Sequence, residues 1–344
     1  MDKIDIRALS YVELEKLIVN IEEKSFRAKQ IYEWLHKKLV DDFSLMTNIS
    51  KTTIEKLSEI AYIPKVTISE KFVSEDGTTK YLFKVKGGII ESVLMKYTSS
   101  VSVCVSTQMG CRMGCTFCAS TIGGLERNLS VGEMLGQVYE IQKDIEDRVS
   151  HVVLMGSGEP LENYDNTLGF IDALVSDKGL DLSARHITLS TCGLIEKIND
   201  LAKKKLQINL AVSLHAPNNE LRQQIMPIAF KYDYDELIKA CKDYGDTTKR
   251  RVTYEYALIK GVNDSTRHAN ELGKKLRGSL AHVNLIPVND VKERNYTKSS
   301  KETISDFSNI LKSLKVETTI RRENGSDINA SCGQLRNERS KENL

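Results

Sequence analysis

The sequence contains no run that approaches the roughly 18 consecutive apolar residues of a membrane-spanning helix. Its first residues, Met1-Asp2-Lys3-Ile4-Asp5, lack the basic stretch and apolar core of a secretory signal. The 344 residues hold no internal repeat and no low-complexity tract. These absences argue against a membrane protein and give no reason to expect export. We therefore expect a soluble, cytoplasmic protein.

An excess of either charge is also missing, since 49 Lys and Arg face 47 Asp and Glu and the net charge is +2. Overall charge therefore neither requires nor excludes a nucleic-acid partner, and local patches must decide. Basic helix faces are more often solvated surface, so such patches alone do not demonstrate RNA binding. The candidate phosphate-binding groups are Lys24, Arg27, Lys29, Lys37 and Lys38, Lys203-Lys204-Lys205, Lys249-Arg250-Arg251, and Arg321-Arg322.

Cysteine is sparse, with seven residues, but three of them are clustered. In a reducing compartment this favours metal or redox chemistry over a disulfide framework. Cys111, Cys115 and Cys118 form C-x-x-x-C-x-x-C on one short loop with Gly110 and Gly114. Iron-sulfur clusters usually take four cysteines, so three thiolates would leave one iron open to a ligand. The alternative is a zinc site, which generally has four ligands arranged as two closely spaced pairs. No second pair of ligands follows the cysteine loop at the spacing of a zinc knuckle.

The first 60 or so residues read as helices, with a packing stripe of Phe26, Ile31, Trp34 and Leu35. After Pro64, residues 65–107 alternate like strands around turns at 75–77 and 87–88. Further strands are expected at 101–106, 151–155, 187–191, 208–214, 251–259, 282–286 and 317–321. Helices are expected at 130–148, opened by a Ser130–Glu133 capping box, and at 233–243, 265–275 and 301–314.

Strands that alternate with helices predict an α/β fold, a parallel sheet with helices outside. Six or seven repeats suit a full or partial barrel, whose functional residues lie at the carboxyl ends of the strands. We divide the chain into an N-terminal helical accessory domain and RNA-binding candidate (1–63), a β-rich linker or extension (64–100), a barrel (101–325) and a C-terminal segment (326–344). The charged end of that segment, Arg336–Leu344, is expected to be loose.

The cysteine loop, with Phe117 before the third cysteine, resembles the radical S-adenosylmethionine (SAM) superfamily, and Leu154–Pro160 resembles its glycine-rich segment. Further segments, which span roughly Glu91 to Leu335, are similar to the RlmN/Cfr family of RNA methyltransferases. The N-terminal helices also resemble that family's accessory domain. The matching segments are Gln108–Cys111, Arg127–Leu129, Met155–Leu161, Ser213–Ala216, Met226–Ile228, Gly261–Asp264, Val283–Pro287 and Ala330–Leu335.

The resemblance implies a partial (β/α)6-type radical SAM TIM barrel with a small N-terminal helical accessory domain and a β-rich linker. It implies a [4Fe-4S] cluster on Cys111, Cys115 and Cys118, whose open iron binds SAM and whose electron yields a 5′-deoxyadenosyl radical. The implied partners are 23S rRNA, transfer RNA and a reductant such as flavodoxin or ferredoxin, with no membrane, for a monomeric enzyme. The SAM-binding residues carried over are Gly158, Glu159, Ser190, Ser213, Leu214, His215 and Asn289.

The resemblance also implies catalytic roles for two cysteines outside the cluster. Cys332 matches the residue that takes a methyl group from one SAM and, after hydrogen abstraction by the radical from a second SAM, adds that carbon to adenine. Cys104 matches the residue that helps remove the ring proton and releases the product through a transient disulfide with Cys332. Glu91 matches a position assigned as a proton acceptor, although it could equally pair with a lysine. Cys192 and Cys241 match no family sulfur.

Two branches of the family differ in the adenine carbon that they methylate. Pro160 and Pro287 resemble the carbon 2 branch, for which the substrates are adenosine 2503 of 23S rRNA and adenosine 37 of transfer RNA; the alternative is the carbon 8 branch, which confers antibiotic resistance. An alternative of another class is a non-catalytic metal-cluster protein that binds RNA. There the cysteines would only brace a loop, and the site would contribute folding energy outright.

Overall fold

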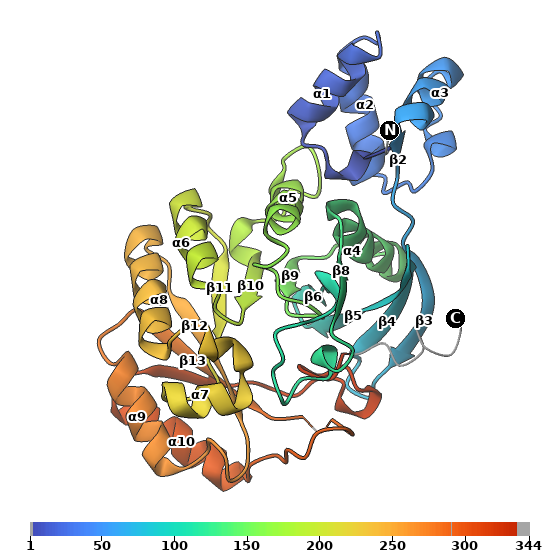
Figure 1. Cartoon of the computed structure of the whole chain (residues 1–344). Helices are drawn as coiled ribbons and strands as arrows, with labels where there is room; N and C mark the ends of the chain where they lie inside the picture. The colour runs from blue at the N-terminus through green and yellow to red at the C-terminus, as the bar shows by residue number, and fades with distance from the viewer. Residues whose placement is uncertain (1–2, 290, 336–344) are drawn as a thin grey trace.

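A computed structural model describes residues 3–289 and 291–335 (Figure 1). The N-terminal lobe contains α1 (Tyr11–Asn20), α2 (Phe26–His36) and α3 (Lys51–Ile60), with short 3-10 turns at Ile6–Ala8 and Phe43–Leu45. The two-residue strands β1 (Ile4–Asp5) and β2 (Ala61–Tyr62) pair in parallel and bring the two ends of the lobe together. The predicted helical character of this part is confirmed.

The packing stripe predicted on α2 is only partly right. Ile31 and Leu35 are fully buried in a core of the lobe's own, but 52% of Phe26 is exposed, because it is the first residue of α2. The lobe is joined to the rest of the chain by a buried hydrogen bond between His36 Nδ1 and Tyr139 Oη, 2.7 Å long. The guanidinium of Arg7, also buried, lies 5.3 Å from the centre of the same tyrosine ring.

One ten-stranded sheet forms the body of the protein, in the order β14-β13-β12-β11-β10-β9-β6-β5-β4-β3. The strands from β6 to β14 pair in parallel, and β3 to β6 pair antiparallel. Because β14 and β3 lie at opposite ends of this order, the sheet is an open, partial barrel, as predicted. The strands are β3 (Thr67–Val73), β4 (Thr79–Val85), β5 (Gly88–Tyr97), β6 (Ser100–Cys104), β9 (His151–Leu154), β10 (Ile187–Thr191), β11 (Asn209–Ser213), β12 (Val252–Leu258), β13 (Ala281–Pro287) and β14 (Glu317–Ile320).

Every strand predicted from Val101 onward is present within one or two residues at each end. The β-rich segment 64–100 forms no sheet of its own among the described residues, because β5 pairs directly with the first parallel strand, β6. Its strands therefore extend the barrel sheet at one edge (Figure 1). The main hydrophobic core lies between this sheet and its helices, and it includes Phe83, Val103 and Leu210.

Helices cross from each parallel strand to the next along the outer face of the sheet (Figure 1). They are α4 (Val131–Ile145), α5 (Tyr164–Val175), α6 (Ile195–Lys204), α7 (Asn219–Ile225), α8 (Tyr234–Thr248), α9 (Thr266–Leu276) and α10 (Lys301–Ser313). The predicted capping box is present, since Ser130 Oγ accepts from Glu133 N and the Glu133 carboxylate accepts from Ser130 N. These crossovers leave the carboxyl ends of successive strands at one end of the barrel.

The segment after β14 is fixed by hydrogen bonds to the β3–β4 turn. Asp327 accepts hydrogen bonds from Ser74 Oγ and Glu75 N, and the Asp76 carboxylate accepts from Gly325 N. The predicted loose end, Arg336–Leu344, lies outside the described residues. Within residues 3–289 and 291–335, none of the helices is long and apolar enough to cross a membrane.

Candidate active site

The loop Cys111–Cys118 begins directly after β7 (Gln108–Gly110). This strand pairs with β8 (Leu125–Asn128) in a small two-stranded sheet. Gly110 has φ +71°, and a Cβ there would lie 1.9 Å from the Gly124 carbonyl oxygen, so only glycine fits. The loop is held by a hydrogen bond from Cys111 N to that same carbonyl and by one from Thr116 N to Ile225 O, each 2.9 Å long. Its backbone is therefore fixed from both sides.

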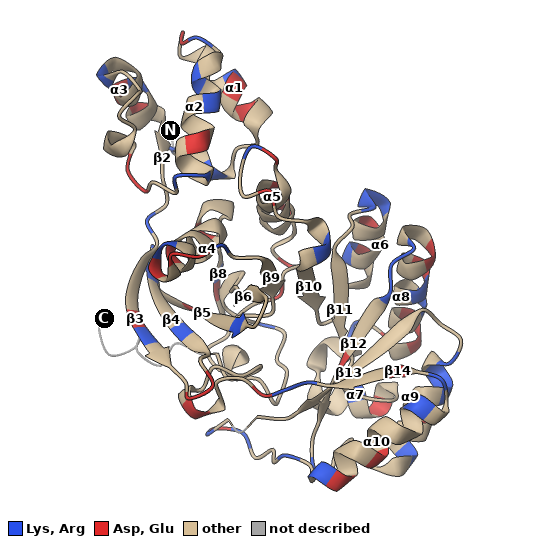
Figure 2. Ribbon diagram, turned by 180° about the vertical axis from the view of Figure 1, so that it is seen from behind, with Lys and Arg blue, Asp and Glu red and all other residues tan. Residues whose placement is uncertain are grey.

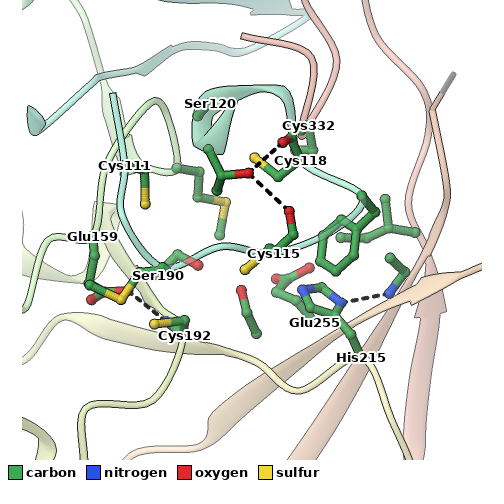
Figure 3. A pocket seen from close by; sticks show the side chains of 18 of the residues that line it. Cys111, Cys115, Cys118, Ser120, Glu159, Ser190, Cys192, His215, Glu255 and Cys332 are labelled. Carbon is green, nitrogen blue, oxygen red and sulfur yellow. Dashed lines mark hydrogen bonds between the residues drawn. The ribbon is translucent and has the colours of Figure 1, made fainter. Parts of the chain in front are cut away.

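Cys111, Cys115 and Cys118 line one cavity, the central pocket, which encloses about 980 Å³ including its open side (Figure 3). Burial raises the pKa of all three thiols, to about 12 for Cys111, and the thiols act electrostatically on one another. Buried thiolates need a compensating positive charge, which a bound metal centre supplies. The donor set therefore fits a thiolate-held cluster.

Zinc is the alternative for the same cysteines. Within the described residues, no three His, Cys, Asp or Glu side chains surround one point as a single metal ion requires. The assignment of a cluster therefore rests on the shared pocket and on the mutual influence of the three thiols.

The glycine-rich segment 156–159 follows β9 and contributes Gly156, Gly158 and Glu159 to the wall of the central pocket. Gly158 has φ +110°, and a Cβ there would lie 2.6 Å from the Gln108 side chain. The buried carboxylate of Glu159 accepts from Cys192 N at 2.7 Å and from Leu161 N at 2.9 Å. Both its oxygens therefore bind backbone, so Glu159 shapes this wall.

The other predicted SAM-binding residues follow successive strands into the central pocket. Ser190, Ser213 and Asn289 line it directly, and Asn289 Nδ2 also donates to the Cys332 carbonyl at 3.0 Å. His215 lines the pocket with φ +55°; its Nδ1 accepts from Ala257 N at 2.9 Å, and burial lowers its pKa to about 3. Its ring is therefore neutral. Leu214 differs, because its side chain is fully buried in the main core and is absent from the pocket lining.

Cys332 joins the central pocket to a second hollow, the side cavity, which Cys104 also lines. Two hydrogen bonds place Cys332 beside the cluster loop: Ala119 N donates to Gly333 O at 2.7 Å, and Ser120 Oγ donates to Leu335 O at 2.7 Å. Figure 3 shows the Cys332 side chain next to Cys118. The Cys104 and Cys332 sulfurs are both free thiols in this structure.

Glu91 is buried on β5, two residues before Val93, which lines the side cavity. Side chains two residues apart share one face of a strand, so Glu91 faces toward that cavity. Its carboxylate lies 4.0 Å from Lys80 Nζ. The structure thus shows the lysine contact that the sequence left open, and a role for Glu91 in proton transfer stays a prediction.

Two residues of the pocket were missed or misread in the sequence. Glu255, in the middle of β12, lines the central pocket and is buried, with no local motif to mark it. Arg321 was expected to bind RNA phosphate, but it lines both the central pocket and the side cavity. The charge of Cys332, and to a smaller extent the charges of Glu255 and Cys104, raise the pKa of its guanidinium above the ordinary value. Arg321 is therefore part of the site, while its neighbour Arg322 stays exposed.

The remaining cysteines lie in different surroundings. Cys192 lines the central pocket and packs with Cys111 and Cys115, and Figure 3 shows it beside Glu159, although no role was predicted for it. Cys241 is buried in α8 within the main core, as expected for a small apolar residue.

The basic patches divide between the two ends of the barrel. Lys203-Lys204-Lys205 end α6 immediately before β11, and Lys249-Arg250-Arg251 precede β12, so both patches lie at the amino ends of the strands, away from the cysteines. Figure 2 shows Lys and Arg spread over many helices rather than gathered on one face. Of the basic residues on and beside α2, Lys24, Lys29 and Lys37 are exposed, whereas Arg27 donates to Asn48 O and Lys38 lies over the Trp34 ring.

Comparison with known proteins matches both parts of the chain. Residues 4–63 match the "Ribosomal RNA large subunit methyltransferase N-terminal domain" family, and residues 105–272 match the "Radical SAM superfamily". The chain is 55% identical over 338 residues to "Probable dual-specificity RNA methyltransferase RlmN" of Alkaliphilus oremlandii, covering 98% of each chain. It is 57% identical to the protein of that name in Clostridium novyi, over 91% of this chain and 92% of that one. The crystal structure of a radical SAM methyltransferase from Sphaerobacter thermophilus superposes with a TM-score of 0.93 at 41% identity, over 97% of this chain and 99% of that one.

Proposed function

The chain belongs to the RlmN family of radical SAM RNA methyltransferases, and from this membership we propose that it methylates carbon 2 of adenosine 2503 in 23S rRNA and of adenosine 37 in transfer RNA. The observation that carries the proposal is the position of Cys332, which lines both the central pocket and the side cavity of Cys104. In this position the Cys332 sulfur can react with SAM in the central pocket and with the Cys104 sulfur in the side cavity.

A [4Fe-4S] cluster and SAM are the cofactors of this family; bound here, they would supply the 5′-deoxyadenosyl radical, and the cluster would take back one electron. We assign the cluster to Cys111, Cys115 and Cys118. Ser190, Ser213 and Asn289 bind SAM, while Glu159 and the neutral His215 keep the pocket walls in place. The electron comes from a low-potential donor such as ferredoxin or flavodoxin.

A radical step is needed because carbon 2 of adenine carries no acidic hydrogen and is not a nucleophile toward a methyl sulfonium. One sulfur then carries the methyl group, and a second sulfur releases the product. In our proposal, the Cys332 thiolate takes the methyl group of one SAM. The radical removes one hydrogen from that methyl, and its carbon then adds to carbon 2. The adduct loses one electron and the ring proton. The Cys104 thiolate attacks the Cys332 sulfur, so that a disulfide forms, the sulfur–carbon bond breaks, and its electron pair on the methyl carbon takes up a proton. Two electrons from an external reductant then return both cysteines to the thiol state for the next turnover.

Nucleoside mass spectrometry tests the reaction itself. Purified enzyme with SAM, a reductant and unmodified rRNA or transfer RNA should form 2-methyladenosine at the two named positions. The carbon 2 assignment is motivated by Pro160 and by Pro287, which lies at the end of β13 in the lining of the side cavity. If the product were 8-methyladenosine, the enzyme would belong to the resistance branch, and the absence of any methylated adenosine would contradict the proposal.

RNA binding should be electrostatic and dispersed, because basic residues are scattered and no base-reading motif is present. Lys29 and Lys37 are suited to charge reversal, since both are exposed, whereas Arg27 is held by a hydrogen bond to Asn48 O. The double Lys29→Glu, Lys37→Glu variant should lower RNA affinity at least roughly tenfold at low salt, and less at high salt. SAM cleavage without RNA should not change.

The matched control reverses Lys242 and Lys274, which are exposed on α8 and α9. Filter binding or fluorescence anisotropy over a series of salt concentrations gives the affinities. If both double variants weakened binding equally, the N-terminal lobe would not be a specific RNA contact. An affinity that did not depend on salt would contradict the electrostatic interpretation.

A further inference from the structure

A second large cavity, which we call the lower chamber, lies inside the barrel at the amino ends of the strands. It encloses about 1170 Å³ including its opening. Closed TIM barrels fill this space with layers of bulky apolar side chains. Here β10 to β14 direct mainly polar side chains into it, and three basic residues line its mouth. The lining includes Thr188, Asn209, Thr253, His282, Asn284, Thr319 and Lys249-Arg250-Arg251.

The lower chamber and the central pocket share part of their walls. Met155, Glu255 and Arg321 line both. These three side chains therefore stand between the two hollows. Lys249-Arg250-Arg251 line the lower chamber on one side of this boundary, the cysteines line the central pocket on the other, and Glu255 lies at the boundary itself.

A chain of hydrogen bonds leads from Glu255 into the lower chamber. Asn284 Nδ2 donates to Glu255 Oε2 at 2.9 Å, and Thr319 Oγ1 donates to Asn284 Oδ1 at 3.0 Å. Thr319 Oγ1 also lies 3.1 Å from His282 Nε2. Because that hydroxyl proton is used on Asn284, His282 must donate from Nε2, which leaves its Nδ1 as an acceptor.

His282 Nδ1 has no hydrogen-bond partner within the described residues, although only 8% of the side chain is exposed. Buried polar atoms of this kind are normally satisfied by protein or by ordered water. His282 lines the lower chamber, but its Nδ1 atom is itself fully buried. The polar lining of the chamber and its open side suit water.

We propose that the lower chamber is a water passage to the reaction site, and that Glu255 transfers protons between this passage and the central pocket while RNA covers the other opening. The inference rests on the proposed function. Each turnover removes one proton from carbon 2 and delivers one to the methyl carbon, so no net proton is required. A connected water passage lets both exchange with solvent.

The surroundings of Glu255 suit this work. Burial raises the pKa of its carboxyl, while Arg321 and the Asn284 amide favour the charged form. A carboxyl whose pKa moves toward neutrality exchanges protons well in both directions. The Asn284 amide orients the carboxyl, and water in the chamber carries the protons, because an amide does not.

The passage can be tested without the reaction. The Thr253→Cys variant places a thiol in the lower chamber, and Asn209→Cys is a second choice should the first not fold. A negatively charged methanethiosulfonate should label this thiol faster than a positively charged one, because the mouth is basic. Bound RNA should leave this rate within about twofold but should protect Cys332, as peptide mass spectrometry would show. A thiol that resists labelling, or that RNA protects as well, would overturn the passage.

Glu255→Gln tests the proton transfer. It should lower turnover by roughly 10²-fold, the usual range for a proton-transferring group, with an unchanged KM for RNA. In D2O, the new methyl group should take up one solvent deuterium in the unaltered enzyme and retain more light hydrogen from carbon 2 in the variant. The Glu255→Asp variant, which keeps a carboxyl, should retain part of the turnover and part of the deuterium uptake. Glu236→Gln, on the exposed side of α8, should change neither the turnover nor the deuterium uptake.

The outcomes separate the two proposals. Unchanged turnover and deuterium content in Glu255→Gln would overturn the role of Glu255. Slower turnover with unchanged deuterium content would also overturn it, since that result marks a purely structural contribution. If the unaltered enzyme methylated no RNA, the proposed function would fail, and the labelling of Thr253→Cys would still decide whether the passage exists.

Discussion

Cys104→Ala should stop the reaction with RNA covalently attached to the protein. The side cavity brings Cys104 and Cys332 together, and the exchange that frees the product needs both sulfurs. Without Cys104, Cys332 can still accept the methyl group and attack adenine, but the sulfur–carbon bond cannot be exchanged. A denaturing gel should show a shifted band that ribonuclease removes, and product turnover should fall to background.

Cys332→Ala is the paired variant and should form neither S-methylcysteine nor adduct, while the cluster remains. Cys241→Ala is the matched control, because Cys241 is buried like Cys104 but lies in α8, away from both cavities. If Cys104→Ala turned over normally without an adduct, its role would be wrong, and Cys192, which lines the central pocket, would be the next sulfur to test.

The pH dependence of release gives a further test of Cys104 in the unaltered enzyme. Burial, and then the neighbouring Cys332, raise the pKa of the Cys104 thiol to about 12, although Arg321 favours the thiolate. Below that pKa, the reactive thiolate fraction grows about tenfold per pH unit. Decay of a preformed adduct should therefore become faster from pH 7 to pH 9. A rate that stayed flat would mean that the thiolate of Cys104 does not limit release.

Removal of any one of Cys111, Cys115 and Cys118 should abolish the brown, oxygen-sensitive chromophore and SAM cleavage together. Three thiolates are the smallest ligand set that holds such a cluster with one open iron. Anaerobic reconstitution of each Cys→Ala variant, followed by iron analysis and measurement of 5′-deoxyadenosine, gives the result. Cys192→Ala, in the same pocket, should keep its iron. A full iron complement and intact SAM cleavage in one of the three variants would contradict the cluster assignment.

Iron removal also separates an enzyme from a protein whose cluster only braces a loop. Cys111 and Cys115 pack in a small cluster with Met113, Ile225 and Met226, separate from the main core of the barrel. The iron-free protein should therefore keep its circular dichroism and unfold cooperatively, although it is inactive. Loss of the fold on iron removal would favour the structural alternative, because a structural metal site contributes folding energy outright.

Local sequence determined the elements and the motif-borne chemistry of this protein. The Ser130 capping box, the alternation of apolar strands with helices and the glycine-bearing cysteine loop are all encoded within a few residues, and each has the predicted form in the structure. The family resemblance added Cys104 and Cys332, which are far apart in the sequence, and the structure places both on the side cavity.

Tertiary structure alone decided which side chains of those elements share a space. Glu255 carries no motif, Arg321 looked like a phosphate ligand, and Leu214 looked like part of the SAM site. A one-residue change in register turns a strand side chain to the opposite face of the sheet, and neighbouring strands fix that register only when the barrel has formed. For the same reason the lower chamber, built from side chains of strands β9 to β14, has no signature in any single segment of the sequence.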